Sequence, residues 1–384
     1  MHAAIYFPSH HSKRGEINAV GHLSPNARTR IRPTFNITKP ASDNNDLIEY
    51  HLSDLAVALA KSWGTALPLF FDFPRYGPEE QATDGRHPVE YFFECVRQLQ
   101  ILGIPVAGPE SIRGPGYAYI DAVARIAHRD GRGAALRIPY RDVNRPDALE
   151  AVIDDTLKAL SLTSAMVDLF LDFEALANLH PEDRSEENLL SVATDALRAI
   201  KDKPFRNVVL CGSSIPDQVG KQYNWNPLRV PRAELKVWMT LVQRESNAVV
   251  KFGDNAVTYV YDDRSGKSGP PPCRVRLSTG TDHILCRAPR GNYRRLCSQI
   301  MKGSDFDATL PAWGAAELLA CGSGRGGEGS ATDWVARDTN LHLEVTTRVV
   351  ESTLSRHGRL AGLSFAELEK FPWLQSGLDI SQTS

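Results

Sequence analysis

The sequence predicts an α/β fold: a (β/α)₈ barrel of the TIM type followed by a C-terminal α+β region. The first observation behind this prediction is that short apolar runs, each stopping at a polar residue, alternate with helical patterns, which favours a parallel sheet. The second is that eight such runs precede residue 261, and eight parallel strands close this barrel. A doubly wound open sheet has similar runs, so only their number favours closure. The predicted strands are residues 4–7, 31–35, 67–71, 104–107, 134–137, 169–171, 208–211 and 249–252.

The intervals between these runs carry helical patterns. Apolar residues between positions 46 and 63 recur close to the 3.6-residue period of one helix face. Pro88, Pro146 and Pro231 begin three further patterns, and proline suits a first helical turn because its missing N–H has no partner there. The predicted helices are residues 46–63, 88–102, 117–127, 146–160, 186–200 and 231–242.

The pattern changes after Tyr261. Residues 262–272 are rich in Asp, Ser, Gly and Pro, which predicts a solvated linker. Residues 274–278 and 283–287 alternate polar and apolar side chains around a short turn, which predicts a β-hairpin. Helices are predicted at 293–301 and 340–357, and the glycine-rich stretch 322–329 is predicted to be a connector because it lacks the Gly-Lys-Ser/Thr ending of a phosphate-binding loop. We therefore divide the chain into a barrel, residues 1–261, and an α+β extension, residues 262–384, with a loose tail from 376.

Composition narrows the classes of function. The 384 residues carry a formal net charge of −2, so a nucleic-acid partner is not indicated by net charge. No apolar run approaches the roughly 18 residues of a membrane span, and the N-terminus lacks the features of a signal peptide. The six cysteines form no C-x-x-C pair, so we expect reduced, mostly buried thiols in a cytoplasmic protein without membrane contact.

Polar residues follow most of the predicted strands, and active sites of (β/α)₈ barrels lie where the strands end. We therefore expect these residues to converge on one mouth, although the alternative for each is a solvated strand end or a helix cap. The residues predicted to be catalytic are Glu16, Asp72, Asp172 and Asp254. The residues predicted to bind substrate are Lys13, Arg137, Ser214, Arg232 and Glu234.

Several carboxylates in one mouth require compensation, because like charges at short distance raise one another's pKa. One solution is a neutral network in which Lys13, Arg137 and Arg232 pair with the acids. The other is a divalent cation, Mg²⁺ or Mn²⁺, bound by the four predicted catalytic carboxylates through oxygen ligands. The cation would polarise a phosphoryl or carbonyl group, whereas the metal-free pair of carboxylates would perform general acid–base chemistry.

The order of several short motifs resembles the bacterial and phage "beta protein" family, named after a protein of phage T4. The motifs are Tyr6-Phe7-Pro8, Lys13-Arg14-Gly15-Glu16, Arg32-Pro33-Thr34-Phe35-Asn36, Phe71-Asp72, Leu136-Arg137, Leu171-Asp172, Gly212-Ser213-Ser214-Ile215-Pro216, Pro231-Arg232-Ala233-Glu234 with Trp238, Phe252-Gly253-Asp254, the glycine-rich stretch 322–329 with Trp334, and Asn340-Leu341-His342. The sequence departs from the family pattern at Asn36, where a glutamate is frequent, and at Asn255, where an aromatic is frequent. The resemblance implies a setting among phage-related or defence-associated genes and supplies no reaction.

Two hypotheses of function follow. The first is a phosphate-ester hydrolase acting on a nucleotide or a nucleic-acid end, in which the carboxylates bind a cation or act as acid and base and Arg137 and Arg232 hold the phosphate. The second is a non-catalytic recognition component of an anti-phage defence system, whose mouth or C-terminal region binds a partner protein, a phage component or a small ligand.

Overall fold

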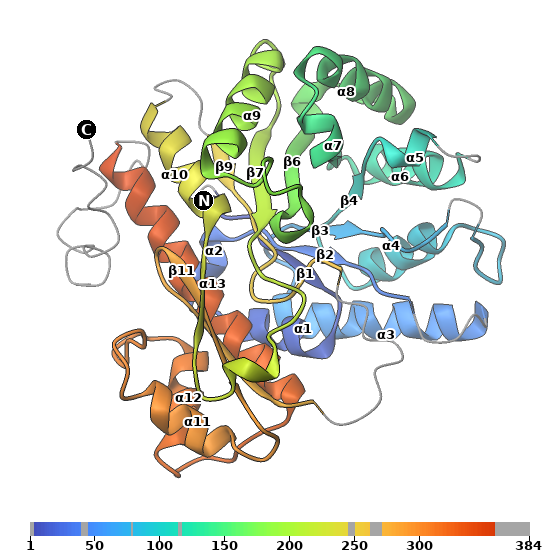
Figure 1. Ribbon diagram of the computed structural model, residues 1–384. Coiled ribbons are helices and arrows are strands. Elements are labelled where there is room, and N and C mark those ends of the chain that lie inside the picture. Colours follow the sequence, from blue (N-terminus) through green and yellow to red (C-terminus); the bar gives the residue numbers. More distant parts are fainter. Residues whose placement is uncertain are drawn as a thin grey trace.

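Eight parallel strands form the centre of the molecule (Figure 1). The computed structural model describes residues 4–39, 45–77, 80–113, 117–244, 250–261 and 271–357, with the side chains of 45–47 left out. The strand order is β1-β2-β3-β4-β5-β6-β7-β9. The strands are β1 (Ser9–His11), β2 (Thr34–Asn36), β3 (Leu69–Asp72), β4 (Gly103–Ala107), β5 (Ala134–Pro139), β6 (Val167–Ala175), β7 (Asn207–Ser213) and β9 (Val250–Phe252).

Seven of the predicted runs coincide with strands of this sheet, and the prediction of a parallel α/β arrangement is confirmed. The first run differs, because the strand begins at Ser9 and only Tyr6 of the predicted segment forms bridges, to Ile31 and to Phe252. Hydrogen bonds reach from this segment to the other edge of the sheet: Phe7 N donates to Phe252 O at 2.8 Å and Ser9 N to Asp254 O at 2.6 Å. The sheet is therefore curled, with its first and last strands near each other.

Side chains alternate between the two faces of each strand. One face carries a compact apolar cluster of Phe7, Phe70, Ile104, Val106, Ala135, Phe170 and Val209, in which the rings of Phe70 and Phe170 meet edge to face at 5.2 Å. The other face carries residues such as Phe71, Leu171 and Phe252, which belong to the larger core shared with the helices. This alternation decides toward which face each polar residue after a strand points.

Helices cover the outer face of the sheet (Figure 1). Predicted helices are confirmed as α3 (Asn45–Trp63), α4 (Pro88–Gln98), α6 (Ala118–Asp130), α8 (Pro146–Leu160), α9 (Glu186–Ala199) and α10 (Ala233–Arg244). Proline occupies the first turn of α4 and α8, as expected, whereas Pro231 ends a strand and α10 begins after it. Short helices that the sequence analysis did not identify are α1 (Arg14–Gly21), α2 (Pro25–Arg30), α5 (Glu110–Arg113) and α7 (Tyr140–Val143).

The C-terminal region contains a second, three-stranded sheet. The predicted hairpin is confirmed as the antiparallel pair β10 (Cys273–Ser278) and β11 (Asp282–Ala288). The short strand β8 (Leu228–Pro231), from the connection before α10, pairs with β11 and was not predicted. Helices α11 (Tyr293–Ile300), α12 (Trp313–Gly322) and α13 (Ala331–Arg356) follow.

Helix α13 connects the C-terminal region to the helices that cover the first and last strands of the sheet, α1 and α10. Its 26 residues start well before the predicted residue 340, because Ser330 and Asp333 form a capping box at its N-terminus. It packs against α1, α2, α10 and β10, and its apolar residues belong to the same core as the sheet. The division at residue 261 stays a prediction. Residues 262–270 of the predicted linker 262–272, and the tail from 376, lie outside the described residues.

The six cysteines are all free thiols, as expected from their spacing. Among the residues that the structure describes, no helix has the length and apolarity needed to cross a membrane.

Candidate active site

A cavity of about 680 Å³ lies at the carboxyl ends of β2 to β6. Its lining includes Asp72, Arg137 and Asp172. Each of them lies two positions after a residue of the compact apolar cluster on the inner face of the sheet, and these residues are Phe70, Ala135 and Phe170. Because side chains two positions apart on a strand share a face, the pleat of β3, β5 and β6 turns these charged groups toward the same side of the curled sheet. The sequence prediction that they converge is confirmed for this trio.

Arg137 lies between the two carboxylates. Its Nε is 3.3 Å from Asp72 Oδ2 and its Nη1 is 3.5 Å from Asp172 Oδ2. Its Nη2 donates to Ser9 Oγ at 3.4 Å. Within the described part of the chain, Nε makes no hydrogen bond of good geometry. The guanidinium is thus held by charge in an orientation that leaves hydrogen-bonding capacity unused.

Burial changes the acidity of these groups. Burial raises the pKa of Asp72, and the charge of Asp172 adds to this increase while Arg137 opposes it. Burial also raises the pKa of Glu174, which lies two residues beyond Asp172 and lines the same cavity. A carboxyl group that keeps its proton to higher pH than usual is suited to general acid catalysis.

Glu174 has an unusual backbone conformation at the rim of the cavity. Its φ of 58° lies in the left-handed region, which costs of the order of 1 kcal/mol for a residue other than glycine. The Glu174 N–H donates to Asp172 Oδ1 at 2.8 Å, and Tyr261 Oη donates to Glu174 Oε1 at 2.6 Å. The strained residue therefore fixes Asp172 on one side and Tyr261 on the other.

Four aromatic side chains line part of the wall, and they were not predicted from the sequence as site residues. Tyr119 is buried and its Oη donates to Val106 O at 2.6 Å, while Tyr261 is 46% exposed at the rim. His11 also faces the cavity, whereas His10 packs against Phe35 on the other face, as expected for neighbours on a strand. The aromatic wall residues are Phe73, Tyr76, Tyr119 and Tyr261.

Asp254 does not reach this cavity, which corrects the prediction that it shares the mouth with Asp72 and Asp172. Asp254 follows Phe252 by two positions, so its side chain lies on the same outer face of the sheet as Phe252. There it points toward α13. Tyr6 Oη donates to its Oδ1 at 2.6 Å, and His342 Nε2 lies 3.0 Å from its Oδ2. Among these partners Asp254 stays ionised, because His342 and Arg232 hold its pKa well below the usual range against the opposing effect of burial.

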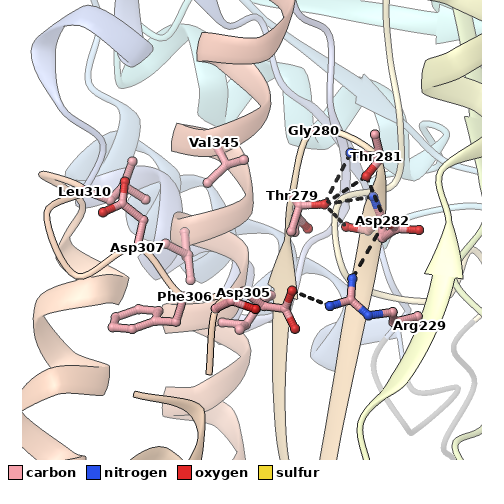
Figure 2. A pocket seen from close by; sticks show the side chains of 14 residues that line it. Arg229, Thr279, Gly280, Thr281, Asp282, Asp305, Phe306, Asp307, Leu310 and Val345 are labelled. Carbon is pink, nitrogen blue, oxygen red and sulfur yellow. Dashed lines mark hydrogen bonds and ion pairs between the residues drawn. The ribbon is translucent and has the colours of Figure 1, made fainter. Parts of the chain in front are cut away.

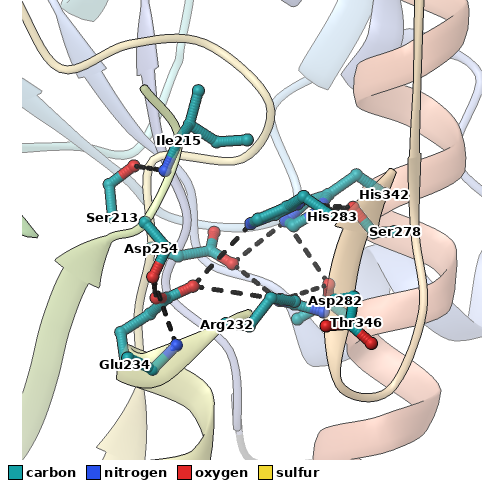
Figure 3. A network of polar contacts seen from close by, with 12 residues as sticks. Ser213, Ile215, Arg232, Glu234, Asp254, Ser278, Asp282, His283, His342 and Thr346 are labelled. Carbon is teal, nitrogen blue, oxygen red and sulfur yellow. Dashed lines mark hydrogen bonds and ion pairs between the residues drawn. The ribbon is translucent and has the colours of Figure 1, made fainter. Parts of the chain in front are cut away.

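Arg232 and Glu234 belong to the same buried network rather than to a substrate-binding surface (Figure 3), and Ser214 joins it through Glu234. Arg232 is fully buried; its Nη2 donates to Asp254 Oδ2 at 3.1 Å and to Thr346 Oγ1 at 3.0 Å. Ser214 Oγ donates to Glu234 Oε2. These contacts join the ends of β7 and β9 to α10 and α13, so their charges are compensated internally, as in the neutral network considered above.

Glu16 and Lys13 line a separate cavity of about 250 Å³. Glu16 Oε1 accepts hydrogen bonds from Thr258 Oγ1 at 2.8 Å and from His11 N at 3.3 Å. The four predicted catalytic carboxylates therefore occupy three places, and the predicted four-carboxylate metal site does not form. In the described ranges no group of three or more His, Cys, Asp or Glu side chains is placed to hold a metal ion.

A further cavity of about 220 Å³ lies between the hairpin turn and the α13 face of the C-terminal region (Figure 2). Its cation, Arg229, is paired with Asp305 and lies 3.9 Å from Asp282. Asp307 Oδ1 accepts hydrogen bonds from Thr309 N and Oγ1. These groups are satisfied by one another, so the cavity has weaker chemistry to offer than the cavity around Arg137.

The family comparison covers nearly the whole described chain. A family model described as Beta protein matches residues 6–348. Comparison with curated proteins gives no match. The matched range includes the cavity around Arg137, the buried network and most of α13.

Proposed function

The chain belongs to the Beta protein family, and we propose that it hydrolyses a phosphate ester in the cavity at the carboxyl ends of β2 to β6. The observation that carries the proposal is the placement of Arg137 between Asp72 and Asp172 in the wall of this cavity. A guanidinium fork matches the oxygens of a phosphate. Two carboxyl groups beside it supply an acid and a base for cleavage.

In the proposed reaction each group has one role. Arg137 binds two phosphoryl oxygens and stabilises the charge that develops on them. Asp172 takes a proton from a water molecule, whose oxygen attacks phosphorus. Asp72 gives its proton to the leaving oxygen as the phosphorus–oxygen ester bond breaks. The raised pKa of Asp72 supports this assignment, because a protonated Asp72 also admits an anionic phosphate beside the remaining carboxylate.

The walls of the cavity support an aromatic or nucleoside group on the ester. The largely buried rings of Phe73, Tyr76 and Tyr119 are among the residues that line the cavity, and Tyr261, 46% exposed, lies at its rim. Aromatic side chains stack favourably with nucleobases. A nucleotide or nucleic-acid end is therefore the substrate class that we propose.

The proposal also includes closure of the sheet into a barrel and the entry of a metal ion. We propose that the sheet functions as a closed (β/α)₈ barrel, supported by the hydrogen bonds from Phe7 and Ser9 to the β9 side. We also propose that any Mg²⁺ or Mn²⁺ enters with the substrate, because Mg²⁺ is commonly bound through one or two carboxylates together with substrate phosphates. The cavity offers Asp172 and Glu174 for this, which leaves Asp72 with its proton.

A recognition role is the second candidate, and one observation favours it. The charge of Arg137 is balanced by Asp72 and Asp172 with no need for a metal ion. This balance suits a ligand-binding pocket as well as a catalytic one. In that case the protein would act in a phage-related or defence setting by binding a nucleotide without converting it. We place either activity in the reducing cytoplasm, supported by six free cysteines.

The experiment is a hydrolysis assay on p-nitrophenyl phosphate and a panel of nucleotides, with Mg²⁺, with Mn²⁺ and with EDTA. We expect turnover that falls about 100-fold or more in Arg137→Ala. The matched control is Arg198→Ala, which removes an arginine that is 72% exposed and paired within its own helix. Nucleotide binding by wild type without turnover under any condition would favour recognition, and neither binding nor turnover would contradict both candidates.

A further inference from the structure

The C-terminal region concentrates positive charge around α11. Between Asp282 and Asp305 the sequence has five arginine and lysine residues and no acidic residue. The whole chain carries a formal net charge of −2, so this excess of cations is local. A local field of one sign attracts a partner of the opposite sign. The five cations are Arg287, Arg290, Arg294, Arg295 and Lys302.

Helix α11 presents three of these cations to solvent. Its buried residues recur at the three- and four-residue spacing of one helix face, and they are Tyr293, Leu296, Cys297 and Ile300. Arg294 and Arg295 lie outside this face and are exposed, as is Lys302, which follows the helix. None of the three forms an ion pair with another residue of the described ranges. Their charges are therefore available to a partner.

A tryptophan lies against the same helix. The Trp225 N–H donates to Arg287 O at 2.8 Å, and the neighbouring Asn224 accepts a hydrogen bond from Arg287 Nη1. The Arg295 guanidinium lies over the Trp225 ring, 4.4 Å from its centroid. These contacts fix the indole beside the exposed cations of α11. Cations next to an aromatic ring are the combination with which proteins hold a nucleic-acid strand, because the cations attract phosphates and a base stacks on the ring.

A cavity of about 280 Å³ lies beside this tryptophan. The half-buried Trp225 and the exposed Gln299 and Lys302 line it, so a ligand can reach it from solvent. Apolar residues such as Ile284 and Leu296 also line it. Asp305 is the acid in the lining, and its carboxylate is paired with Arg229. A cavity with apolar residues, an indole and one amide suits a planar base.

We propose that Trp225, Arg290, Arg294, Arg295 and Lys302, which we call the α11 surface, bind a single-stranded nucleic acid. The cations would contact its phosphates, and one base would enter the cavity beside Trp225. A single strand is the form that fits, because the bases of a duplex are paired and stacked and are not free to enter a cavity. Stacking on an aromatic ring accepts every base, so we expect little sequence preference.

The α11 surface is independent of the proposed hydrolysis. Its cavity shares no lining residue with the cavity around Arg137. Binding of a strand at α11 therefore requires no activity at Arg137. An acidic protein is the other partner that exposed cations would attract, but cations alone would serve it and the cavity beside Trp225 would have no role.

The test is fluorescence anisotropy of a labelled oligothymidylate of about 12 nucleotides, a length within the range that single-strand-binding domains cover. The full chain is titrated in EDTA at about 50 mM and about 200 mM salt. We expect binding that weakens about tenfold between these two conditions, because a protein that contacts several phosphates displaces counterions from the strand. A duplex of the same length should bind more weakly.

Two variants separate the charge from the ring. The double variant Arg294→Glu with Lys302→Glu should weaken binding about tenfold or more and make its salt dependence shallower. Trp225→Leu keeps an apolar side chain and should weaken binding about tenfold without changing the salt dependence. The matched control is Arg184→Glu with Arg198→Glu, which changes the net charge equally at exposed positions at and before α9. It should bind as wild type does, and circular dichroism verifies that each variant is folded.

The outcomes distinguish this surface from the proposed active site. Binding that Arg137→Ala retains and the α11 double variant loses supports the proposal even if the protein hydrolyses nothing. No binding at about 50 mM salt, or binding unchanged in both α11 variants, would overturn it. Binding lost only in Arg137→Ala would place the strand in the larger cavity.

Three further comparisons test the kind of partner. Duplex binding as tight as single-strand binding would contradict a base in the cavity. Binding that Trp225→Leu leaves unchanged and that polyglutamate displaces as well as unlabelled oligothymidylate does would replace the nucleic acid by an acidic protein. Where the proposal holds, tighter binding of oligouridylate than of oligothymidylate identifies RNA as the ligand, and the reverse identifies DNA.

Discussion

Asp172 has the most constrained position among the acids of the candidate active site. The Glu174 N–H fixes its Oδ1 at 2.8 Å, and its Oδ2 lies 3.5 Å from Arg137 Nη1. An asparagine at this position keeps an oxygen for the Glu174 N–H and loses the negative charge that would accept a proton. The residue can therefore be tested without removing the contact that shapes the rim.

We predict that Asp172→Asn lowers kcat by about 100-fold or more while the protein stays folded, because a general base contributes rate of this size. Hydrolysis kinetics and circular dichroism measure the two quantities. The control is Asp195→Asn, an exposed acid on α9, which should leave both unchanged. Full activity in folded Asp172→Asn would remove this residue from the mechanism.

A second titration belongs to Asp338, on α13. Burial raises its pKa to about 7, against the opposing effect of Arg276. Between the ordinary value of 3.8 and about 7, the folded state holds a proton that the unfolded chain has lost. Stability from this residue is therefore fully present below the unfolded pKa and is lost as pH rises toward 7.

We predict that the stability of Asp338→Asn relative to wild type increases with pH across this window, by up to about 1.4 kcal/mol per pH unit. Urea unfolding at pH 4.5, 5.5 and 6.5 measures the difference. Asp333→Asn serves as the control that should show no slope in this window, because Ser330 lowers the pKa of Asp333 and its titration therefore lies below the ordinary value of 3.8. A difference between Asp338→Asn and wild type that does not change with pH would contradict the assignment.

At the scale of elements, the buried network ties the sheet to α13. Asp254 at the end of β9 contacts Tyr6 before β1, Arg232 before α10 and His342 on α13. Ser278 on β10 contacts both His342 Nδ1, at 2.7 Å, and His283 Nδ1, at 3.1 Å. One set of polar contacts thus fixes the hairpin, the long helix and both edges of the sheet.

We predict that Asp254→Ala destabilises the protein by about 3–5 kcal/mol, because it leaves Arg232 charged and buried beside a cavity. Urea denaturation measures this loss. Asp217→Ala, at an exposed position before α10, is the matched control and should change stability by less than about 0.5 kcal/mol. If Asp254→Ala retained wild-type stability but lost activity, the network would be part of the catalytic machinery rather than a structural tie.

At the scale of the whole molecule, the arrangement of α13 makes a prediction about fragments. The fragment 1–261 lacks α13, which covers Tyr6, Asp254 and the outer side of the first and last helices. We predict that this fragment does not unfold cooperatively on its own, and that it binds dyes specific for exposed apolar surface. Thermal melts and dye fluorescence measure this, and a sharp melt of the fragment would support an independent barrel domain.

The sequence predicted the order of strands and helices well, because continuous apolar runs and helical periodicity are local signals. It did not show which face each strand turns inward. Runs such as Leu67 to Phe71 are apolar on both faces, because parallel strands are covered on both sides. The sequence of such a run therefore does not show that the side chain of Asp72 points inward and that of Asp254 outward. The aromatic wall was missed for a similar reason, because Tyr119 and Tyr261 lie in a helix and a loop whose positions depend on the tertiary fold.

The tie between Tyr6 and His342 has a consequence for how the protein is made. The ribosome releases the first strand long before the last helix, and the phenol of residue 6 finds its imidazole partner 336 positions later. Until α13 has been synthesised, the segment around Tyr6 and the side chain of Asp254 lack the helix that covers them in the folded protein. Nascent chains of this protein must therefore wait in an incomplete state, and we expect them to depend on holding chaperones more than chains whose ends fold locally.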